Sequence, residues 1–265
     1  MRPKEYRIKE LLREKGLDGA IVSSPENFHY VTGFGGHQHT VSRQPGFTLA
    51  VMRADDKVPT HLTTMDFEAA TFRIKAAGLN FVVDPYDTWV GLKTWDEIAH
   101  GAVVPDKTAM ESSMHKLVQF MKACDLANKK VGIELDYLPV PYYKSLTEKF
   151  PEAEFVDISD LFVYARSVKQ PDEIEMFRKL CRIADHGFTE VSKIAKIGVS
   201  ERELVQCFRE DVIKSGFCAP SSWSMFSTGP SASRPTIPGD GVAKDGDVLK
   251  EDRLIRDRLG YPWRG

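Results

Sequence analysis

The chain has no long apolar run. Crossing a bilayer takes roughly 20 consecutive apolar residues, and no stretch of this sequence approaches that length. Residues 1–7 are charged and amphipathic, whereas a signal peptide needs an apolar core near its start. These absences argue against a membrane-spanning or secreted protein and predict a cytoplasmic one.

Cysteine is scarce, and neither sign of charge dominates. The four cysteines include no Cys-x-x-Cys pair, which argues against a zinc knuckle or a disulfide framework and predicts reduced, mostly buried thiols. The 36 Lys and Arg residues nearly balance the 38 Asp and Glu residues, for a net charge of -2. No basic block stands out, so we expect neither nucleic acid nor an anionic membrane as a partner.

The composition is sufficient for two modest domains, because 265 residues with 42% hydrophobic content can bury more than one core. Over residues 1–160, helical patterns alternate with short strand-like runs, which is typical of an α/β domain with a mixed sheet. Strands are expected at 17–22, 47–52, 61–64, 80–83, 131–134 and 154–156, and helices at 4–15, 66–77, 113–128 and 141–150. The pattern changes near Asp160, where we place the domain boundary.

Two helices are predicted within residues 161–265. Pro171 in a first turn followed by two acids favours a helix start after Gln170. Its apolar stripe, which runs toward Gly198, consists of Ile174, Phe177, Cys181, Ala184, Phe188, Val191 and Ala195. Ser200 and Glu203 then have the spacing of a capping box, and the second helix carries the stripe Leu204, Phe208 and Val212.

A series of short motifs resembles the creatinase, prolidase and aminopeptidase P family. The later motifs are Arg166-Ser-Val-Lys169, Gly198-Val-Ser-Glu201, Ser227-Thr-Gly-Pro230 and Lys244-Asp-Gly-Asp-Val248, and the earlier ones are Leu17-Asp18, Tyr30-Val-Thr-Gly-Phe34 and Val131-Gly-Ile-Glu134. The resemblance implies a creatinase-type N-terminal α/β domain over 1–160. Over 161–265 it implies the first part of an α+β "pita-bread" catalytic domain.

In complete members, the resemblance implies two divalent ions (Mn, Co or Zn) held by two aspartates, a histidine and two glutamates. Two ions about 3.5–4 Å apart activate a bridging water and polarise a carbonyl group. Asp252 stands where the first aspartate is expected, although Glu251 replaces its usual apolar neighbour. The other ligands are missing from the last 13 residues. We therefore expect a chain truncated within the catalytic domain, with no complete metal centre and no assigned catalytic or cofactor-binding residue.

A second departure concerns substrate binding. Peptidase members of the family present Pro-His just after the Gly-Pro turn, where this chain has Arg234-Pro235-Thr236. Threonine cannot carry a proton near neutral pH as histidine can. This difference favours creatinase-like hydrolases and lyases of the same fold over a standard proline peptidase.

Two histidines in the Gly-rich loop after Tyr30, His37 and His39, form the other candidate site. They could share a metal or line the pocket of a partner subunit. The lack of a cysteine or acid at ligand spacing favours the pocket. Because family members often dimerise, the resemblance implies a homodimer.

Three functional hypotheses follow. The first is a metal-dependent C–N hydrolase of the Xaa-Pro peptidase or creatinase type, acting in complete relatives on small peptides or small C–N substrates, with this chain inactive alone. The second is a non-catalytic peptide-binding or dimerisation module of the same fold. The third is a fragment of a metal-dependent lyase. For an incomplete catalytic domain, we also expect poor order beyond about residue 220.

Overall fold

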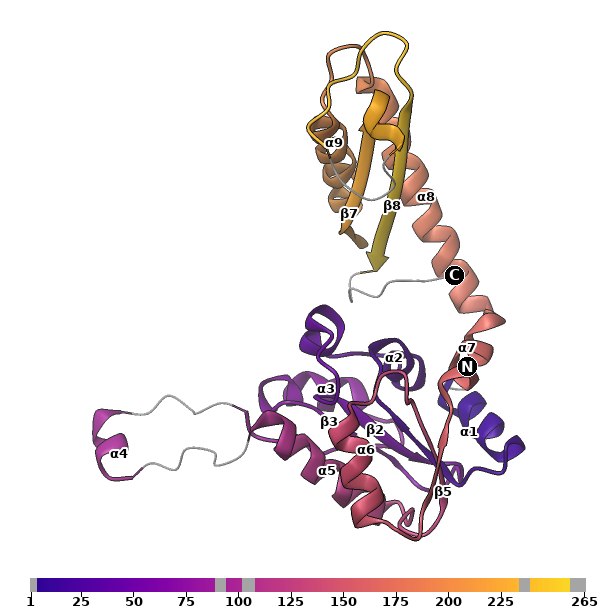
Figure 1. Cartoon of the computed structure of the whole chain (residues 1–265), viewed down its shortest axis with the longest axis vertical. Helices are drawn as coiled ribbons and strands as arrows, with labels where there is room; N and C mark the ends of the chain where they lie inside the picture. Colours follow the sequence, from indigo (N-terminus) through magenta and orange to yellow (C-terminus); the bar gives the residue numbers. More distant parts are fainter. Residues whose placement is uncertain (1–3, 89–93, 102–107, 234–238, 258–265) are drawn as a thin grey trace. The chain divides into compact units, whose positions relative to one another are not determined.

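The computed structural model describes residues 4–88, 94–101, 108–233 and 239–257. The chain divides into two compact units, Met1–Val168 and Lys169–Gly265 (Figure 1). The boundary expected near Asp160 falls at the start of helix α7 (Ser159–Ser167), which belongs to the first unit. No helix within the described ranges is long and apolar enough to cross a membrane.

The first unit is built on a six-stranded sheet in the order β4-β3-β2-β1-β5-β6. The strands are β1 (Gly19–Val22), β2 (Leu49–Arg53), β3 (Thr60–Thr63), β4 (Phe81–Val83), β5 (Lys130–Ile133) and β6 (Glu154–Asp157). Strand β2 is antiparallel to both of its neighbours, while the other pairings are parallel. The mixed α/β architecture predicted from the alternating pattern is therefore confirmed.

Helices cover both faces of this sheet. The first unit contains α1 (Lys4–Glu14), α2 (Pro25–Thr32), η1 (Gln38–Ser42), η2 (Asp66–Glu68), α3 (Ala69–Ala76), α4 (Trp95–Ala99), α5 (Ala109–Ala123), α6 (Val140–Lys149) and α7. The side chains of strand β1 contribute to both helix layers, one on each face of the sheet. Ala20 and Val22 belong to the core that includes α1, α2, α3 and α7, whereas Ile21 belongs to the core that includes α5 and α6. A strand buried on both faces has no polar alternation, as observed for β1.

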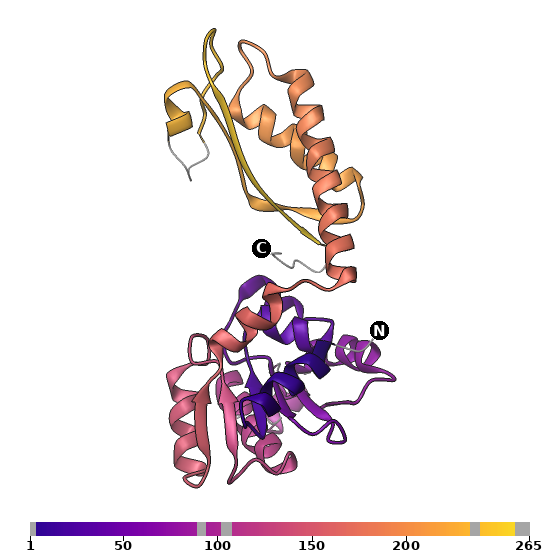
Figure 2. The ribbon, with the colours of Figure 1, turned by 90° about the vertical axis from the view of Figure 1, so that its right-hand side faces the viewer.

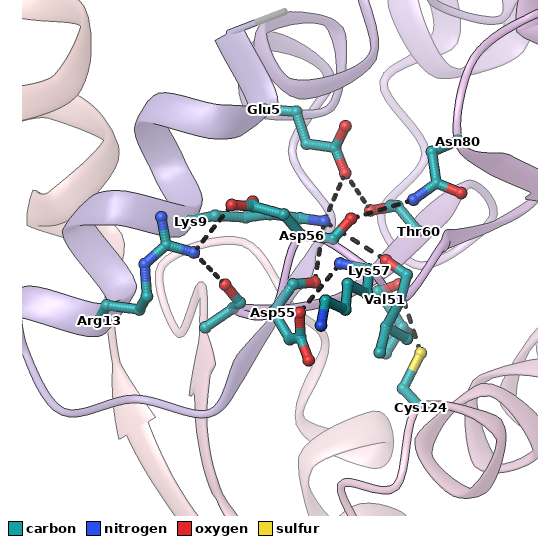
Figure 3. A network of polar contacts seen from close by, with 12 residues as sticks. Glu5, Lys9, Arg13, Val51, Asp55, Asp56, Lys57, Thr60, Asn80 and Cys124 are labelled. Carbon is teal, nitrogen blue, oxygen red and sulfur yellow. Dashed lines mark hydrogen bonds and ion pairs between the residues drawn. The ribbon is translucent and has the colours of Figure 1, made fainter.

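A buried ion pair attaches α1 to the turn between β2 and β3 (Figure 3). Lys9 is 1% exposed, and its ammonium lies 3.1 Å from the carboxylate of Glu5. The ammonium also donates to the carbonyl oxygens of Asp55 and Val58, each at 3.4 Å, and Thr60 donates to Glu5 at 2.5 Å. Buried charges need such partners because leaving water is costly. The polar positions of α1 therefore take part in packing as well as its apolar ones.

The second unit packs two helices on one face of a two-stranded antiparallel sheet, as Figures 1 and 2 show. Its elements are α8 (Pro171–Ile194), α9 (Glu201–Lys214), β7 (Cys218–Thr228), η3 (Gly229–Ser233) and β8 (Leu249–Asp257). Strands β7 and β8 pair from Cys218 opposite Asp257 to Thr228 opposite Leu249, with an irregularity between Pro220 and Ser224. The poor order expected beyond residue 220 stays a prediction.

The predicted second stripe is confirmed, since Leu204, Phe208 and Val212 of α9 are fully buried. The stripe predicted for α8 is partly wrong. Ile174 and Cys181 are exposed, and the buried positions are Glu173, Leu180, Gly187 and Val191.

Gly187 lies on the buried face of α8 and contributes to the difference between the predicted and the observed face. A Cβ at this position would lie 2.7 Å from the ring of Phe208, so the missing side chain lets α9 approach α8 closely. A sequence pattern that counts only apolar side chains assigns no burial to glycine. The true face therefore lies about one residue away from the predicted one.

Candidate functional site

Helix α9 begins with the predicted capping box. The Ser200 hydroxyl accepts from the amide of Glu203 at 3.2 Å, and the Glu203 carboxylate accepts from the amide of Ser200 at 2.8 Å. This exchange satisfies two amide groups at the helix start. It also fixes Glu201 as the first residue of the helix.

Glu201 is a buried acid, 1% exposed, that holds the Ser-Thr-Gly-Pro turn (227–230). One carboxylate oxygen, Oε1, accepts from the amide of Thr228 at 2.8 Å and from the hydroxyl of Ser231. The other oxygen, Oε2, has no hydrogen-bond partner within the described part of the chain. Two family motifs far apart in sequence are thus joined by one side chain.

The same carboxylate lies against the backbone of residues 239–241. A Cβ on Gly239 would lie 2.3 Å from Oε2, and one on Gly241 would lie 2.6 Å from Oε1. The Gly241 carbonyl accepts from the amide of Glu201 at 2.9 Å. A side chain at Gly239 or Gly241 would therefore displace the Glu201 carboxylate from its present position.

The Lys244-Asp-Gly-Asp-Val248 motif contacts the Ser-Thr-Gly-Pro turn (227–230) at Gly229. This residue has φ 53°, and a Cβ on it would lie 2.7 Å from the carboxylate of Asp247. Its amide donates to the carbonyl of Val248 at 3.2 Å, while Asp247 accepts from the amide of Lys244 at 2.9 Å. The Ser-Thr-Gly-Pro and Gly-Asp-Val motifs therefore form one local structure.

Asp252 belongs to β8, three residues beyond the start of the strand, and is paired in register with Met225 of β7. The described strand backbone thus carries the position assigned to the first metal ligand. The Arg234-Pro235-Thr236 stretch and the residues after Asp257 lie outside the described residues. Among the side chains that are described, no three of His, Cys, Asp or Glu converge as a metal ligand set would.

The two candidate histidines of the first unit have different surroundings. His37 is exposed and precedes the π-helical turn η1. His39 is 1% exposed, its Nε2 lies 2.8 Å from the carbonyl of Ser23, and burial lowers its pKa to about 4. Of these two histidines, only His37 is exposed to another molecule. Its role in a partner subunit's pocket stays a prediction.

Sequence reasoning missed a buried polar network around Glu134, which follows β5 and is 1% exposed. Its carboxylate accepts from the amides of Ser23 and Ser24, the hydroxyl of Ser24 at 2.6 Å and the side-chain amide of Asn27. Burial raises the pKa of Glu134, and these hydrogen bonds lower it in part. The sequence places Glu134 at the end of the Val131-Gly-Ile-Glu134 motif, directly after a buried strand, but does not indicate its partners.

Comparison with known families assigns the first unit. Residues 6–168 match the Creatinase/Prolidase N-terminal domain. The chain belongs to the creatinase/prolidase family. Glu134 and the network after β1 lie within this matched domain, and the Glu201 motifs follow it.

Similarity to individual proteins of this family extends into the second unit. The chain is 23% identical over 231 residues to a Xaa-Pro dipeptidase of Lactobacillus delbrueckii subsp. lactis, covering 86% of this chain and 55% of the relative. It is 22% identical over 204 residues to an ectoine hydrolase of Halomonas elongata, covering 76% of this chain and 45% of the relative.

Solved structures agree on the creatinase/prolidase fold. A recombinant prolidase from Thermococcus sibiricus superimposes with a TM-score of 0.72 at 20% identity, covering 98% of this chain and 63% of the prolidase. The chain therefore spans roughly half to two thirds of the length of these three relatives. At this identity the superposition establishes the fold alone.

Proposed function

We propose that the chain supplies the N-terminal domain and the first part of the catalytic domain of a metal-dependent C–N hydrolase, of the Xaa-Pro peptidase or creatinase type. We further propose that residues 1–265 alone are inactive. The observation that carries this proposal is the junction of three family motifs at Glu201 and Gly229, next to the hairpin that contains Asp252. The similarity to a Xaa-Pro dipeptidase and an ectoine hydrolase supports a hydrolase acting on a peptide or another small C–N substrate.

The described residues do not fit a dinuclear metal centre by themselves. Two divalent ions require several carboxylates and usually a histidine, and no such group of three occurs among the described side chains. Asp252 is the one position that the family resemblance assigns to the centre. The function therefore depends on ligands that these residues do not bring together, and we derive no catalytic step through the metal.

The proposal is tested by assaying the 265-residue protein with Mn²⁺, Co²⁺ or Zn²⁺ on Xaa-Pro dipeptides and on creatine. We expect no hydrolysis above the rate with metal alone. The Xaa-Pro dipeptidase of Lactobacillus delbrueckii subsp. lactis serves as the positive control for the peptide assay. Metal-dependent turnover that is lost in an Asp252→Asn variant would contradict the inactivity of the chain.

Metal content gives an independent readout. We expect elemental analysis after dialysis to find the same low metal content in the unchanged protein and in Asp252→Asn. Two bound ions per chain, lost in the variant, would show that these residues hold a complete centre.

A further inference from the structure

The second unit has a cleft of about 370 Å³ between α8 and the end of α9. This volume lies in the range of small-molecule sites. Four lining residues come from α8 at the spacing i, i+3, i+4, i+7, which places them on one face of the helix. The lining includes Lys179, Arg182, Ile183 and His186 of α8, with Asp211 and Lys214 of α9.

Two ammonium groups in this cleft have no carboxylate partner among the described residues. Lys179 lies over the ring of Phe217, 3.4 Å from its centroid, and Lys214 forms no described ion pair. Arg182, by contrast, pairs with Glu175 at 3.1 Å, and both side chains are largely exposed. An exposed pair of this kind contributes little and can exchange its partner. The cleft therefore carries an excess of positive charge.

The acid in the cleft does not cancel this excess. Asp211 is hydrogen-bonded to Nδ1 of His186 at 2.9 Å. That hydrogen bond raises the pKa of His186. His186 also lies 3.7 Å from Glu190, which pairs with Lys193 at 2.6 Å. Among the charged lining residues, Lys179, Arg182 and Lys214 outnumber Asp211.

We infer that this cleft binds a small phosphate monoester. A phosphate ester carries about -1.5 to -2 charges at pH 7 and three acceptor oxygens, which complements two ammonium groups with a guanidinium beside them. Ile183 offers an apolar surface for the organic part of the ligand. The site is separate from the motifs around Glu201 and Asp252. It does not depend on the proposed hydrolase function.

The test measures binding of phenyl phosphate to the 265-residue protein by isothermal titration calorimetry at fixed ionic strength. We expect saturable binding that weakens as salt is added. A double variant, Lys179→Met with Lys214→Met, should raise the Kd at least tenfold. The matched control, Lys75→Met, removes an exposed lysine of α3 in the first unit and should leave the Kd unchanged.

Ligand comparisons define the chemistry. O-Phosphoserine should bind in the same cleft, and benzoate, which has one charge, should bind at least tenfold more weakly than phenyl phosphate. Amide chemical shifts should move in α8 and at the end of α9. Non-saturable binding, equal Kd values in the double variant, or equally tight benzoate binding would each overturn the inference. Unchanged circular dichroism spectra would show that the variants are folded.

Discussion

Glu134 in the first unit and Glu201 in the second are both buried acids that hold a turn of backbone, but they differ in how fully they are satisfied. Both oxygens of Glu134 accept hydrogen bonds, from two backbone amides and three side chains. Glu201 uses one oxygen and leaves Oε2 without a partner in the described residues. Glu134 is therefore fully hydrogen-bonded within the first unit, while Glu201 keeps one free acceptor oxygen beside the family motifs, among the described residues.

Removing Glu134 should have the largest effect. Glu134→Ala strands the buried amides of Ser23 and Ser24, and each unsatisfied buried group costs about 1–3 kcal/mol. We expect a loss of about 3–5 kcal/mol in the unfolding free energy of the first unit. Native-state hydrogen exchange of the β1 and β5 amides measures it.

The matched variant is Glu134→Gln, which keeps one acceptor oxygen. The side-chain oxygen of Asn27 has no partner among the described residues. If the Asn27 amide rotates, this oxygen accepts a hydrogen bond from the new NH₂ group. We expect a smaller loss than for alanine. Equal losses would show that both carboxylate oxygens are needed as acceptors.

The next largest effect should be the change in the unfolding free energy of the first unit with pH. Burial lowers the pKa of His39 to about 4, below its ordinary 6.5, so the unfolded chain binds more protons between these values. Stability that is full above pH 6.5 is therefore lost as pH falls toward 4, by roughly 3 kcal/mol. Hydrogen exchange of the β1 amides from pH 7.5 to 4.5 measures the slope. His39→Leu should reduce it, and His37→Leu, at an exposed position, should not.

Glu201 should be less costly to replace than Glu134. Glu201→Ala removes the nearer of two acceptors for the Thr228 amide, which also donates to the Ser231 hydroxyl at 3.1 Å, and should cost about 1–2 kcal/mol. Glu201→Gln keeps that acceptor and removes a buried charge, so we expect a change within about 1 kcal/mol. Hydrogen exchange of Thr228 and Gly229 measures both. A loss for the glutamine variant as large as that for Glu134→Gln would remove the distinction between the two acids.

The smallest expected effect comes from His186 of the second unit. Its contribution to stability changes with pH in the opposite direction to that of His39. The hydrogen bond that His186 donates to Asp211 raises the pKa of His186, so the stabilising contribution is full below pH 6.5 and is lost as pH rises through the raised pKa. NMR titration of the imidazole should show a lower pKa in Asp211→Asn. An unchanged pKa would mean that the hydrogen bond does not persist in solution.

Local patterns predicted much of this fold. All six sheet strands of the first unit overlap the expected ranges, and the α9 stripe and capping box are confirmed, because strand burial and capping depend on neighbours in sequence. Helices α2, α4 and α7 lie outside the predicted helix ranges. The Tyr30-Val-Thr-Gly-Phe34 motif covers the end of α2, where Gly33 has φ 80°.

The contacts of the candidate site could not be predicted in the same way, because they join residues that are distant in sequence. Glu134 lies 111 residues from Ser23, and no local pattern indicates that its carboxylate is buried there. Glu201 was recognised as part of a family motif, but its contact with Thr228 and the adjacent glycines follows only from the packing of α9 on β7. The thiols show the same limit. Cys124 is buried as expected, whereas Cys181 is exposed on the face of α8 that was assigned to the core.

The close approach of Gly239 and Gly241 to Glu201 also limits how this sequence can vary. A methyl group at either glycine would overlap the carboxylate, so an alanine there requires the Glu201 side chain to move or to be shortened. The acid and the two glycines should therefore change together among homologues, and a Gly241→Ala defect should be rescued by Glu201→Ala. Covariation at these three positions would record the contact in an alignment, without any structure.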